Sequence, residues 1–199
     1  MRALLFVFTL LILAGCSNGG SSSSDGKSMK ISPTEFTKRE TVLLEGLSGQ
    51  EVLGYDVSLM PNGPLFHIIV EHYQDGVKQE NVLEITDPIS EDQALKSILI
   101  TRETTEQSFT VKALTYNEDG FSSMESNGEY NEANSSAVFE KLEEEVTFKL
   151  NEQVAIGMTI EDDGDELTSG VLQEDDPRFQ ESISKYQDVF IYKIFVSKE

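Results

Sequence analysis

Residues 65–85 read LFHIIVEHYQDGVKQENVLEI, and this stretch decides the class of fold that we expect. Its first nine residues place apolar side chains on both faces of a strand, with Phe66, Ile68 and Val70 on one side and Leu65, Ile69 and Tyr73 on the other. Asp75-Gly76 then predicts a two-residue type I′ turn, because both residues tolerate the positive φ that this turn requires. The stretch therefore predicts a β-hairpin whose return strand covers about residues 77–85.

Further strands are predicted on both sides of this hairpin. Period-two alternation or a short apolar run marks residues 53–59, 97–102, 108–116, 146–150, 154–160 and 189–196. Asn151-Glu152-Gln153 predicts a second hairpin, which would join the strands over residues 146–150 and 154–160. Residues 189–196 are almost wholly apolar, so we expect that strand to be buried on both faces and central in its sheet.

The end of the chain also predicts one short helix. Asp176 can cap Pro177 at the first helical position, and Phe179, Ile183 and Tyr186 fall on one face. About eight or nine strands with one short C-terminal helix favour a mainly β fold, an antiparallel β-sandwich, of which the immunoglobulin-like form is one option. The alternative is an α+β open sheet with a helix on one face, in which residues 136–145 would form a second helix.

A polar segment, residues 117–136, interrupts the strand pattern. It is rich in Gly, Asn and Ser and is longer than most connections in a compact domain, so we expect a long loop. The segment carries Phe121, Met124 and Tyr130 at intervals that suit neither a helix face nor a strand face. Exposed aromatic residues supply binding energy in small interfaces, which makes this segment a candidate recognition loop. The alternative is that the three side chains fold back and cover an edge of the sandwich.

The first sixteen residues predict export. Arg2, the apolar run of residues 3–12 and the small Ala14 and Gly15 form the pattern of an export signal, whose ten apolar residues are too few to span a bilayer. Leu13-Ala14-Gly15-Cys16 resembles the lipobox of bacterial lipoproteins. This resemblance implies cleavage before Cys16 and a lipid anchor on its sulfur, in which acyl chains such as palmitate hold the protein at the membrane.

These patterns divide the chain into three parts. Residues 1–15 form the expected lipoprotein signal peptide, residues 16–28 the lipidated Cys16 with a Ser/Gly-rich tether, and residues 29–199 a single strand-rich domain. The tether has no large apolar residue, so we expect a flexible spacer with a reach on the order of 20 Å. The mature protein would be exported and anchored to the cell membrane, at its outer leaflet or its periplasmic face.

Composition limits the partners that this protein can have. The formal net charge is -21, so the surface repels phosphate backbones, and we exclude nucleic acid as a partner. Solubility in a crowded envelope explains the same charge without any partner. Cys16 is the single cysteine, so the chain can form neither an internal disulfide nor a cysteine metal site.

Residues that could carry chemistry are few. His67 and His72 are separated by an odd interval, which sends them to opposite faces of a strand and argues against a shared metal ion. The acidic stretch 161–176 fails the EF-hand spacing, so a solvated loop is favoured over a calcium site. Ser182-Ile183-Ser184-Lys185 matches Ser-x-x-Lys, but the companion motifs of the penicillin-recognising enzymes are missing. We predict no cofactor.

Two functions from different classes remain. The first is a membrane-anchored lipoprotein of the bacterial cell envelope that acts as a binding or accessory module for a protein or cell-wall partner. The second is an envelope hydrolase that uses paired carboxylates, which 36 acidic residues leave open. The first is favoured because loops of sandwiches commonly carry recognition and because the common catalytic constellations lack their parts.

Overall fold

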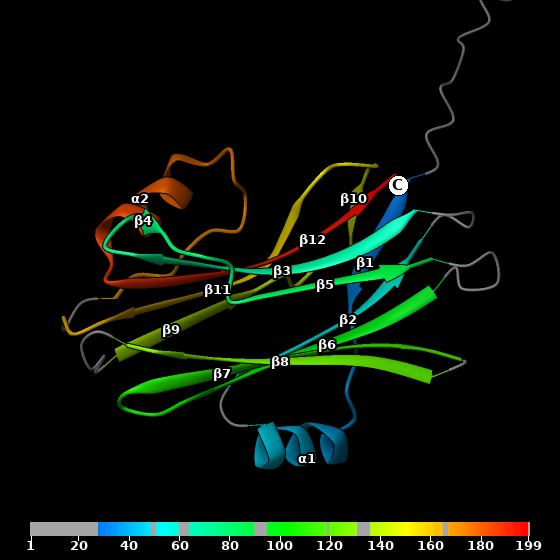
Figure 1. Ribbon diagram of the computed structural model, residues 1–199, viewed down its shortest axis with the longest axis horizontal. Helices are drawn as coiled ribbons and strands as arrows, with labels where there is room; N and C mark the ends of the chain where they lie inside the picture. Colours follow the sequence, from blue (N-terminus) through cyan, green and yellow to red (C-terminus); the bar gives the residue numbers. More distant parts are fainter. Residues whose placement is uncertain are drawn as a thin grey trace, which may run out of the picture.

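Two antiparallel sheets stack face to face in the computed structural model, which describes residues 28–48, 51–59, 64–89, 95–118, 120–130, 136–164 and 167–198 (Figure 1). Sheet I has the strand order β10 (Val146–Phe148), β1 (Met29–Pro33), β2 (Glu51–Ser58), β6 (Leu95–Thr104), β7 (Ser108–Asn117) and β8 (Gly120–Glu129). Sheet II has the order β4 (Val77–Lys78), β3 (Leu65–Gln74), β12 (Asp188–Ser197), β11 (Val154–Asp162) and β9 (Ser136–Lys141), and β5 (Leu83–Pro88) also pairs with β3. The antiparallel β-sandwich is confirmed, and both sheets are open at their edges.

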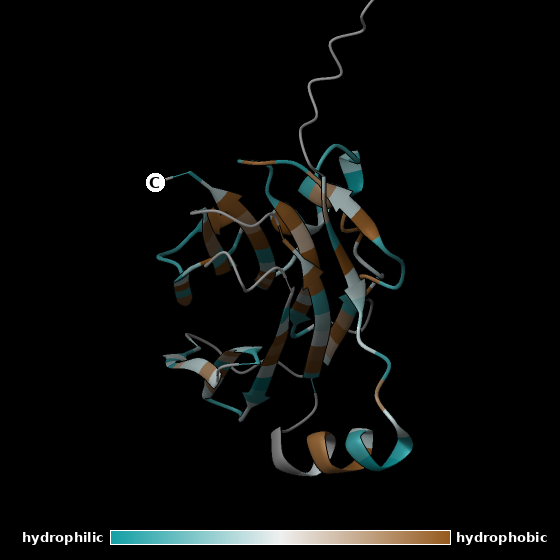
Figure 2. Cartoon of the chain, turned by 90° about the vertical axis from the view of Figure 1, so that its right-hand side faces the viewer, coloured by the Kyte–Doolittle hydropathy of each residue, from teal (hydrophilic) through white to brown (hydrophobic). Residues whose placement is uncertain are grey.

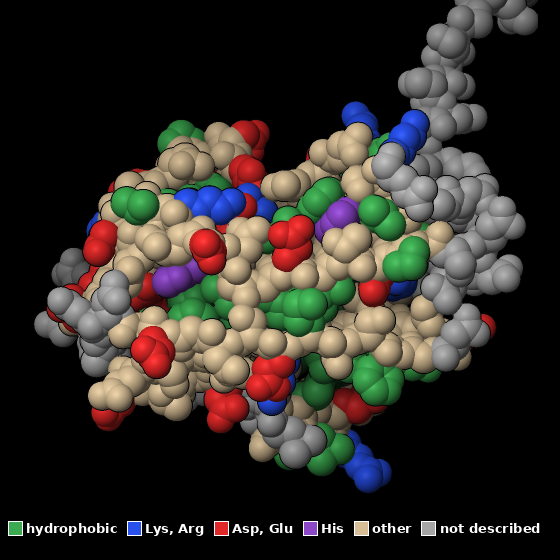
Figure 3. Space-filling view, viewed as in Figure 1, with side chains coloured by type: hydrophobic (Ala, Val, Ile, Leu, Met, Phe, Trp, Pro, Cys, Tyr) green, Lys and Arg blue, Asp and Glu red, His purple; other side chains and the backbone are tan. Residues whose placement is uncertain are grey.

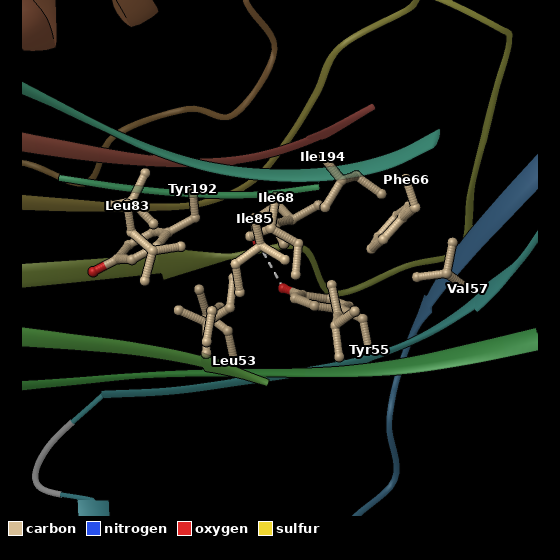
Figure 4. Close-up of a cluster of buried hydrophobic side chains, with 14 of the residues drawn as sticks. Leu53, Tyr55, Val57, Phe66, Ile68, Leu83, Ile85, Tyr192 and Ile194 are labelled. Carbon is tan, nitrogen blue, oxygen red and sulfur yellow. Dashed lines mark hydrogen bonds between the residues drawn. The ribbon is translucent and has the colours of Figure 1, made fainter. Parts of the chain in front are cut away.

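The main core lies between the sheets. Alternate residues of the strands point inward, and Figure 4 shows Leu53, Tyr55 and Val57 of β2 facing Phe66, Ile68, Leu83, Ile85, Tyr192 and Ile194 of sheet II. Apolar and polar residues alternate along the strands in Figure 2, while the connections between them are mostly hydrophilic. Burial of each such side chain contributes about 1.5–3 kcal/mol, so this interface is the main source of stability.

The hairpin at Asp75-Gly76 is confirmed. The two residues have φ values of 49° and 76°, and Gln74 pairs with Val77. The return is not one continuous strand, because β4 covers only Val77–Lys78 and β5 begins at Leu83. The prediction that the last strand is central is also confirmed, since β12 lies between β3 and β11.

The second predicted hairpin is wrong. β10 pairs with β1 in sheet I, and β11 belongs to sheet II, so the turn after β10 carries the chain from one sheet to the other. Asn151 takes the positive φ of 62° at this crossing, and its amide donates to the Val196 carbonyl at 2.7 Å. Alternation alone does not distinguish the two arrangements, because both sheets bury one face of each strand.

The C-terminal helix α2 (Pro177–Lys185) forms as predicted. A carboxylate oxygen of Asp176 accepts from the Arg178 amide at 2.9 Å, which caps the first turn. Phe179, Ile183 and Tyr186 pack on the outer face of sheet II, where they form a second, smaller core with a set of residues from β11 and β12: Ala155, Met158, Ile160, Val189 and Ile191. The helix therefore covers the face of sheet II that points away from sheet I.

A second helix, α1 (Lys38–Ser48), was not predicted. Thr37 and Glu40 form a capping box, in which the Glu40 amide donates to the Thr37 hydroxyl at 3.3 Å and the Thr37 amide donates to the Glu40 carboxylate at 2.8 Å. The helix lies at the side of sheet I that faces away from sheet II (Figure 1). Neither of the helices in the described ranges is long and apolar enough to cross a membrane.

Two further segments differ from the sequence prediction. Residues 136–145, the second helix of the open-sheet alternative, begin instead with β9, which pairs along β11. The expected long loop over residues 117–136 contains β8, which pairs with β7 from Asn117↔Gly120 to Ser108↔Glu129. The face of β8 that turns toward the core carries Ser122, Ser126 and Gly128 with Met124 as its one large apolar residue, and the Phe109 ring lies where a Cβ at Gly128 would be, at 2.2 Å. Because most residues on this face are small or polar, β8 does not show the period-two alternation of apolar residues that predicts a strand.

Candidate functional site

A pocket of about 600 Å³ opens between α1 and one rim of the sandwich. Four parts of the chain form its walls, namely the connection after β1, helix α1, the first half of β2, and the end of β9 with the residues that follow it. The lining residues are Pro33, Thr34, Phe36, Thr41, Leu44, Val52, Gly54, Tyr55, Phe139, Glu140, Lys141, Leu142 and Glu143. The wall combines apolar side chains, such as those of Phe36, Leu44 and Phe139, with a comparable amount of polar surface, and its charged side chains are confined to residues 140–143.

The pocket exists because β1 is short. Its last residue, Pro33, pairs with Tyr55, and the next amide, that of Thr34, donates to the Gly54 carbonyl at 2.9 Å. The chain then leaves the sheet and turns into α1, so β2 has no neighbouring strand along Glu51–Leu53 on that side within the described residues. The missing length of β1 is the space that α1 and the end of β9 enclose.

Gly54 fixes one wall of this pocket. The Phe36 ring lies directly against its backbone, since a Cβ at Gly54 would come within 2.2 Å of the Phe36 Cζ atom. Any larger residue would therefore displace the Phe36 ring or push the connection to α1 away from β2. The glycine allows an aromatic ring to stand beside the strand as part of the pocket lining.

Tyr55 closes the inner side. Its hydroxyl donates to the Ile156 carbonyl at 2.6 Å and accepts from the Leu142 amide at 3.0 Å, which ties β2 to β11 and to the end of β9. Burial raises the pKa of the Tyr55 hydroxyl well above its ordinary value, so the group stays a neutral donor at physiological pH. The contact holds the two sheets together where the pocket separates their rims.

A second polar region lies between the sheets on the other face of β2. Arg102 of β6 is buried, and its guanidinium donates to Glu51 at 3.0 Å and to Glu161 at 2.7 Å. It also donates to the Tyr130 hydroxyl, and its Cζ atom lies 4.2 Å from the centroid of the Phe190 ring. We call Glu51, Arg102, Tyr130, Glu161 and their neighbours Thr159 and Tyr192 the Arg102 cluster.

The ionisable groups of the Arg102 cluster shift one another's pKa values. Burial raises the pKa of Glu51, against the opposing effect of Arg102 and of the Thr159 hydroxyl, which donates to this carboxylate at 2.8 Å. Burial lowers the pKa of the Arg102 guanidinium, but its anionic partners raise this pKa by more, so that it lies above its usual range. The cluster therefore holds a permanent cation whose hydrogen bonds occupy both acidic partners.

Paired carboxylates of the kind that a hydrolase needs are not presented by this cluster. Glu51 and Glu161 are both buried and both bind Arg102, so neither faces a substrate cleft. Glu140 and Glu143 do line the pocket, but they stand at its rim, half-buried and exposed. The arrangement suits binding better than acid–base chemistry.

The predicted recognition residues are separated by the structure. Phe121 and Met124 lie on β8 with 70% and 45% of their surface exposed, whereas Tyr130 is buried in the Arg102 cluster. The prediction of a loop is wrong for Phe121 and Met124, because β8 is a paired strand, whereas Tyr130 lies directly after that strand. Phe121 also borders a smaller pocket of about 270 Å³ at the opposite edge of the sandwich, near Asp87 and Lys96. Cys16, the predicted lipid attachment site, lies outside the described residues.

The histidines point to opposite faces, as predicted. His67 lies on the outer face of sheet II, where its ring nitrogens lie 3.0 Å from the Thr86 hydroxyl and 2.8 Å from the Ser197 hydroxyl. His72 is buried beside Asp188, with Nε2 2.7 Å from its carboxylate. Within the described ranges, no three His, Cys, Asp or Glu side chains are grouped so as to hold a metal ion.

Most of the described acidic stretch is a connection between β11 and α2, as predicted, and only its first two residues belong to β11. Glu161 belongs to β11 and the Arg102 cluster, and Asp176 caps α2. Between them, Glu174 pairs with Lys193 at 2.9 Å on the outer face of sheet II. These three acids therefore serve separate structural contacts.

Sequence reasoning missed the pocket and the Arg102 cluster. The Thr37-x-x-Glu40 capping box was a visible signal for α1, and with it for one pocket wall. Nothing in the sequence joins Glu51, Arg102 and Glu161, which come from three strands in two sheets. Only the registers of β2 with β6 and the stacking of the sheets bring them together.

These features define a two-sheet β-sandwich with a pocket at one rim and an ionic cluster in its interior. The chain belongs to the YgaN domain family, whose model matches residues 30–196. Comparison with curated proteins and with solved structures gave no significant match. The matched residues include the pocket and the Arg102 cluster, whereas the lipobox precedes them.

Proposed function

We propose that this protein is a membrane-anchored lipoprotein of the bacterial cell envelope and acts as a binding module, with the pocket beside α1 as its binding site. The observation that carries the proposal is the pocket itself, which has about 600 Å³ of space, a wall of mixed apolar and polar surface, and charged side chains at residues 140–143. Ligand sites of proteins commonly have this size and combine apolar side chains with a few polar groups.

The position of the pocket suits a protein that is held at a membrane by its N-terminus. The first described residues enter the domain at the top of Figure 1, whereas α1 and the pocket wall that it forms lie at the bottom. Figure 2 shows the same separation from the side. A lipid on Cys16 and a tether up to residue 28 would leave the pocket accessible from the aqueous side.

The anchor is tested by replacing Cys16 with Ser. We expect the native protein in the membrane fraction, with a mass that includes a diacylglyceryl group on Cys16, and the Cys16→Ser protein unlipidated. An unmodified Cys16 on a soluble native protein would overturn the anchor. Mass spectrometry of both fractions provides the measurement.

The binding site is tested by photo-crosslinking in intact cells. A photoreactive phenylalanine analogue replaces Thr41, which lines the pocket, or Val77, which is exposed on the hairpin away from it. We expect a discrete adduct from position 41 and none from position 77. A third variant carries the analogue at Phe121, because the exposed β8 residues are the second candidate contact. Adducts from position 121 alone would move the site to β8.

A further inference from the structure

We propose that the pocket beside α1 binds an extended, basic segment of polypeptide, which adds as a strand to the free edge of β9 and inserts apolar side chains between Phe36, Leu44 and Phe139. This inference rests on the proposed function, since it names the ligand of the same site. Three observations support it: an open strand edge on each side of the pocket, the apolar lining between these edges, and the charge of the surrounding surface.

The first open edge belongs to β9. This strand is the last in sheet II and pairs only with β11 in the part of the chain that the structure describes. The Leu142 amide donates to the Ile156 carbonyl at 3.0 Å, so the main chain of Leu142 points toward β11. Main-chain groups alternate in direction along a strand, and those of Phe139 and Lys141 therefore point away from β11, toward the pocket side.

The second open edge belongs to β2. The Gly54 carbonyl accepts from Thr34, so the main chain of Gly54 points to the side on which β1 would continue. By the same alternation, the amide and carbonyl of Val52 point to that side too. β1 ends at Pro33, opposite Tyr55, so no strand of the described residues pairs with Val52 on that side. Both edges thus offer main-chain donors and acceptors to whatever occupies the pocket.

An extended polypeptide satisfies such groups, whereas an acyl chain does not. A purely apolar ligand would remove water from the main-chain groups of Val52 and Phe139 without replacing their hydrogen bonds, which is costly. A strand replaces them with its own amides and carbonyls, and its alternate side chains, about 6.6 Å apart, would enter the apolar lining. The combination of open edges and apolar walls therefore favours a peptide.

The negative charge of the protein favours a basic peptide over an acidic one. The formal net charge is -21, and Figure 3 shows acidic side chains spread over the face in view. At the pocket rim, Glu140 and Glu143 outnumber Lys141. A cationic segment would be attracted during encounter, and an anionic one, including a second copy of this acidic chain, would be repelled.

The test uses the full lipidated protein in detergent micelles and three labelled heptapeptides. The first alternates Lys and Val. The second replaces every Lys by Glu, and the third keeps the charges but has N-methylated main-chain amides on its Val residues. Fluorescence anisotropy measures each affinity. We expect the Lys/Val peptide to bind at least tenfold more tightly than either of the others, because only it supplies both the charge and the hydrogen bonds.

Matched variants locate the site. Thr41→Trp fills the pocket from α1, and Val42→Trp places the same side chain on the neighbouring residue, which is 60% exposed and does not line the pocket. We expect binding of the Lys/Val peptide to fall at least tenfold in Thr41→Trp and to be unchanged in Val42→Trp. Equal binding by both variants would mean general electrostatic attraction and would overturn the proposal.

Other outcomes are decisive as well. Equal affinity for the Glu/Val peptide would overturn the choice of a basic ligand, and equal affinity for the N-methylated peptide would overturn strand addition. A fluorescent fatty acid that binds the native protein but not Thr41→Trp would show that the ligand is an acyl chain. A crosslink from position 41 in cells, together with no peptide binding, would overturn this inference and leave the proposed function intact.

Discussion

The two faces of the first half of β2 differ sharply. Glu51 points between the sheets, where both terminal nitrogens of the Arg102 guanidinium bind buried partners and only its Nε lacks a hydrogen bond within the described residues. Val52, the next residue, lines a pocket that no side chain fills. Successive side chains of a strand point to opposite faces, so one segment serves both regions. We infer that the buried Arg102 cluster holds the first half of β2 in place, while the other face of this strand lines the pocket.

Removal of the central cation should give the largest effect. In an Arg102→Met variant, Glu51 and Glu161 would remain buried without their counter-charge, and we expect a loss of about 3–5 kcal/mol in the free energy of unfolding. Urea denaturation measures this loss. Lys112→Met is the control, because the ion pair of Lys112 with Glu125 is exposed and should contribute at most about 1 kcal/mol. Equal losses in the two variants would mean that the cluster does not hold β2.

Tyr55→Phe tests the boundary between the two regions. The substitution removes the hydrogen bonds to the Ile156 carbonyl and from the Leu142 amide, which keep the bond between them at 3.0 Å, and we expect a loss of about 1–2 kcal/mol. Tyr116→Phe on the exposed face of β7 is the matched control and should be neutral. A neutral Tyr55→Phe variant, by the same urea measurement, would show that the sheets need no link beside the pocket.

The hairpin at Asp75-Gly76 lies away from both regions and provides a reference for the cost of local backbone strain. Gly76 has φ of 76°, so Gly76→Val should cost about 1–2 kcal/mol through backbone strain. The Cβ would also lie 3.3 Å from the Ser184 Cα atom. Gly46→Ala in α1, where a Cβ meets nothing within 4 Å, is the control and should not destabilise the fold. An unchanged denaturation midpoint in Gly76→Val would show that the turn tolerates another geometry.

Much of the fold could be predicted because its signals are local. The Asp75-Gly76 turn, the capping of α2 by Asp176 and the apolar run of β12 each lie within a few residues of sequence. β8 could not be predicted, since its core-facing side carries serines and Gly128, which admits the Phe109 ring, and only one large apolar residue, Met124. The Arg102 cluster depends on pairing between distant strands, which sequence periodicity does not encode.

The sequence singled out some residues near the candidate sites, but it predicted neither their surroundings nor the pocket. Tyr130 was singled out as an exposed aromatic residue, yet its hydroxyl binds Arg102 in the interior. Phe121 and Met124 are exposed as expected, although on a strand. The pocket arises from where β1 stops, and no residue type marks the length of an edge strand.

The smallest effect should come from His67, which provides a contrast in pH dependence to the Arg102 cluster. Burial lowers the pKa of the His67 imidazole, opposed by the nearby Glu84 carboxylate. The neutral ring lies between the Thr86 and Ser197 hydroxyls and stacks on Phe195 at 4.1 Å. As the pH falls below about 6.5, the unfolded chain takes up a proton at this position before the folded one does, so the stability that the neutral ring contributes is lost.

A His67→Gln variant removes that titration and keeps a side chain able to bond both hydroxyls. We expect the variant to be slightly less stable than the native protein at pH 7.5, and the difference between them to shrink as the pH falls from 7 toward 5. Urea midpoints at four pH values measure the difference. Glu51 acts in the opposite sense, because its raised pKa makes the folded state take up a proton first and gain stability as the pH falls. That contribution is present in both proteins and cancels in the difference. A difference in urea midpoint that stays constant over this pH range would mean that His67 has the same pKa in the folded and unfolded states. The hydrogen bonds of its buried ring would then not favour the neutral form.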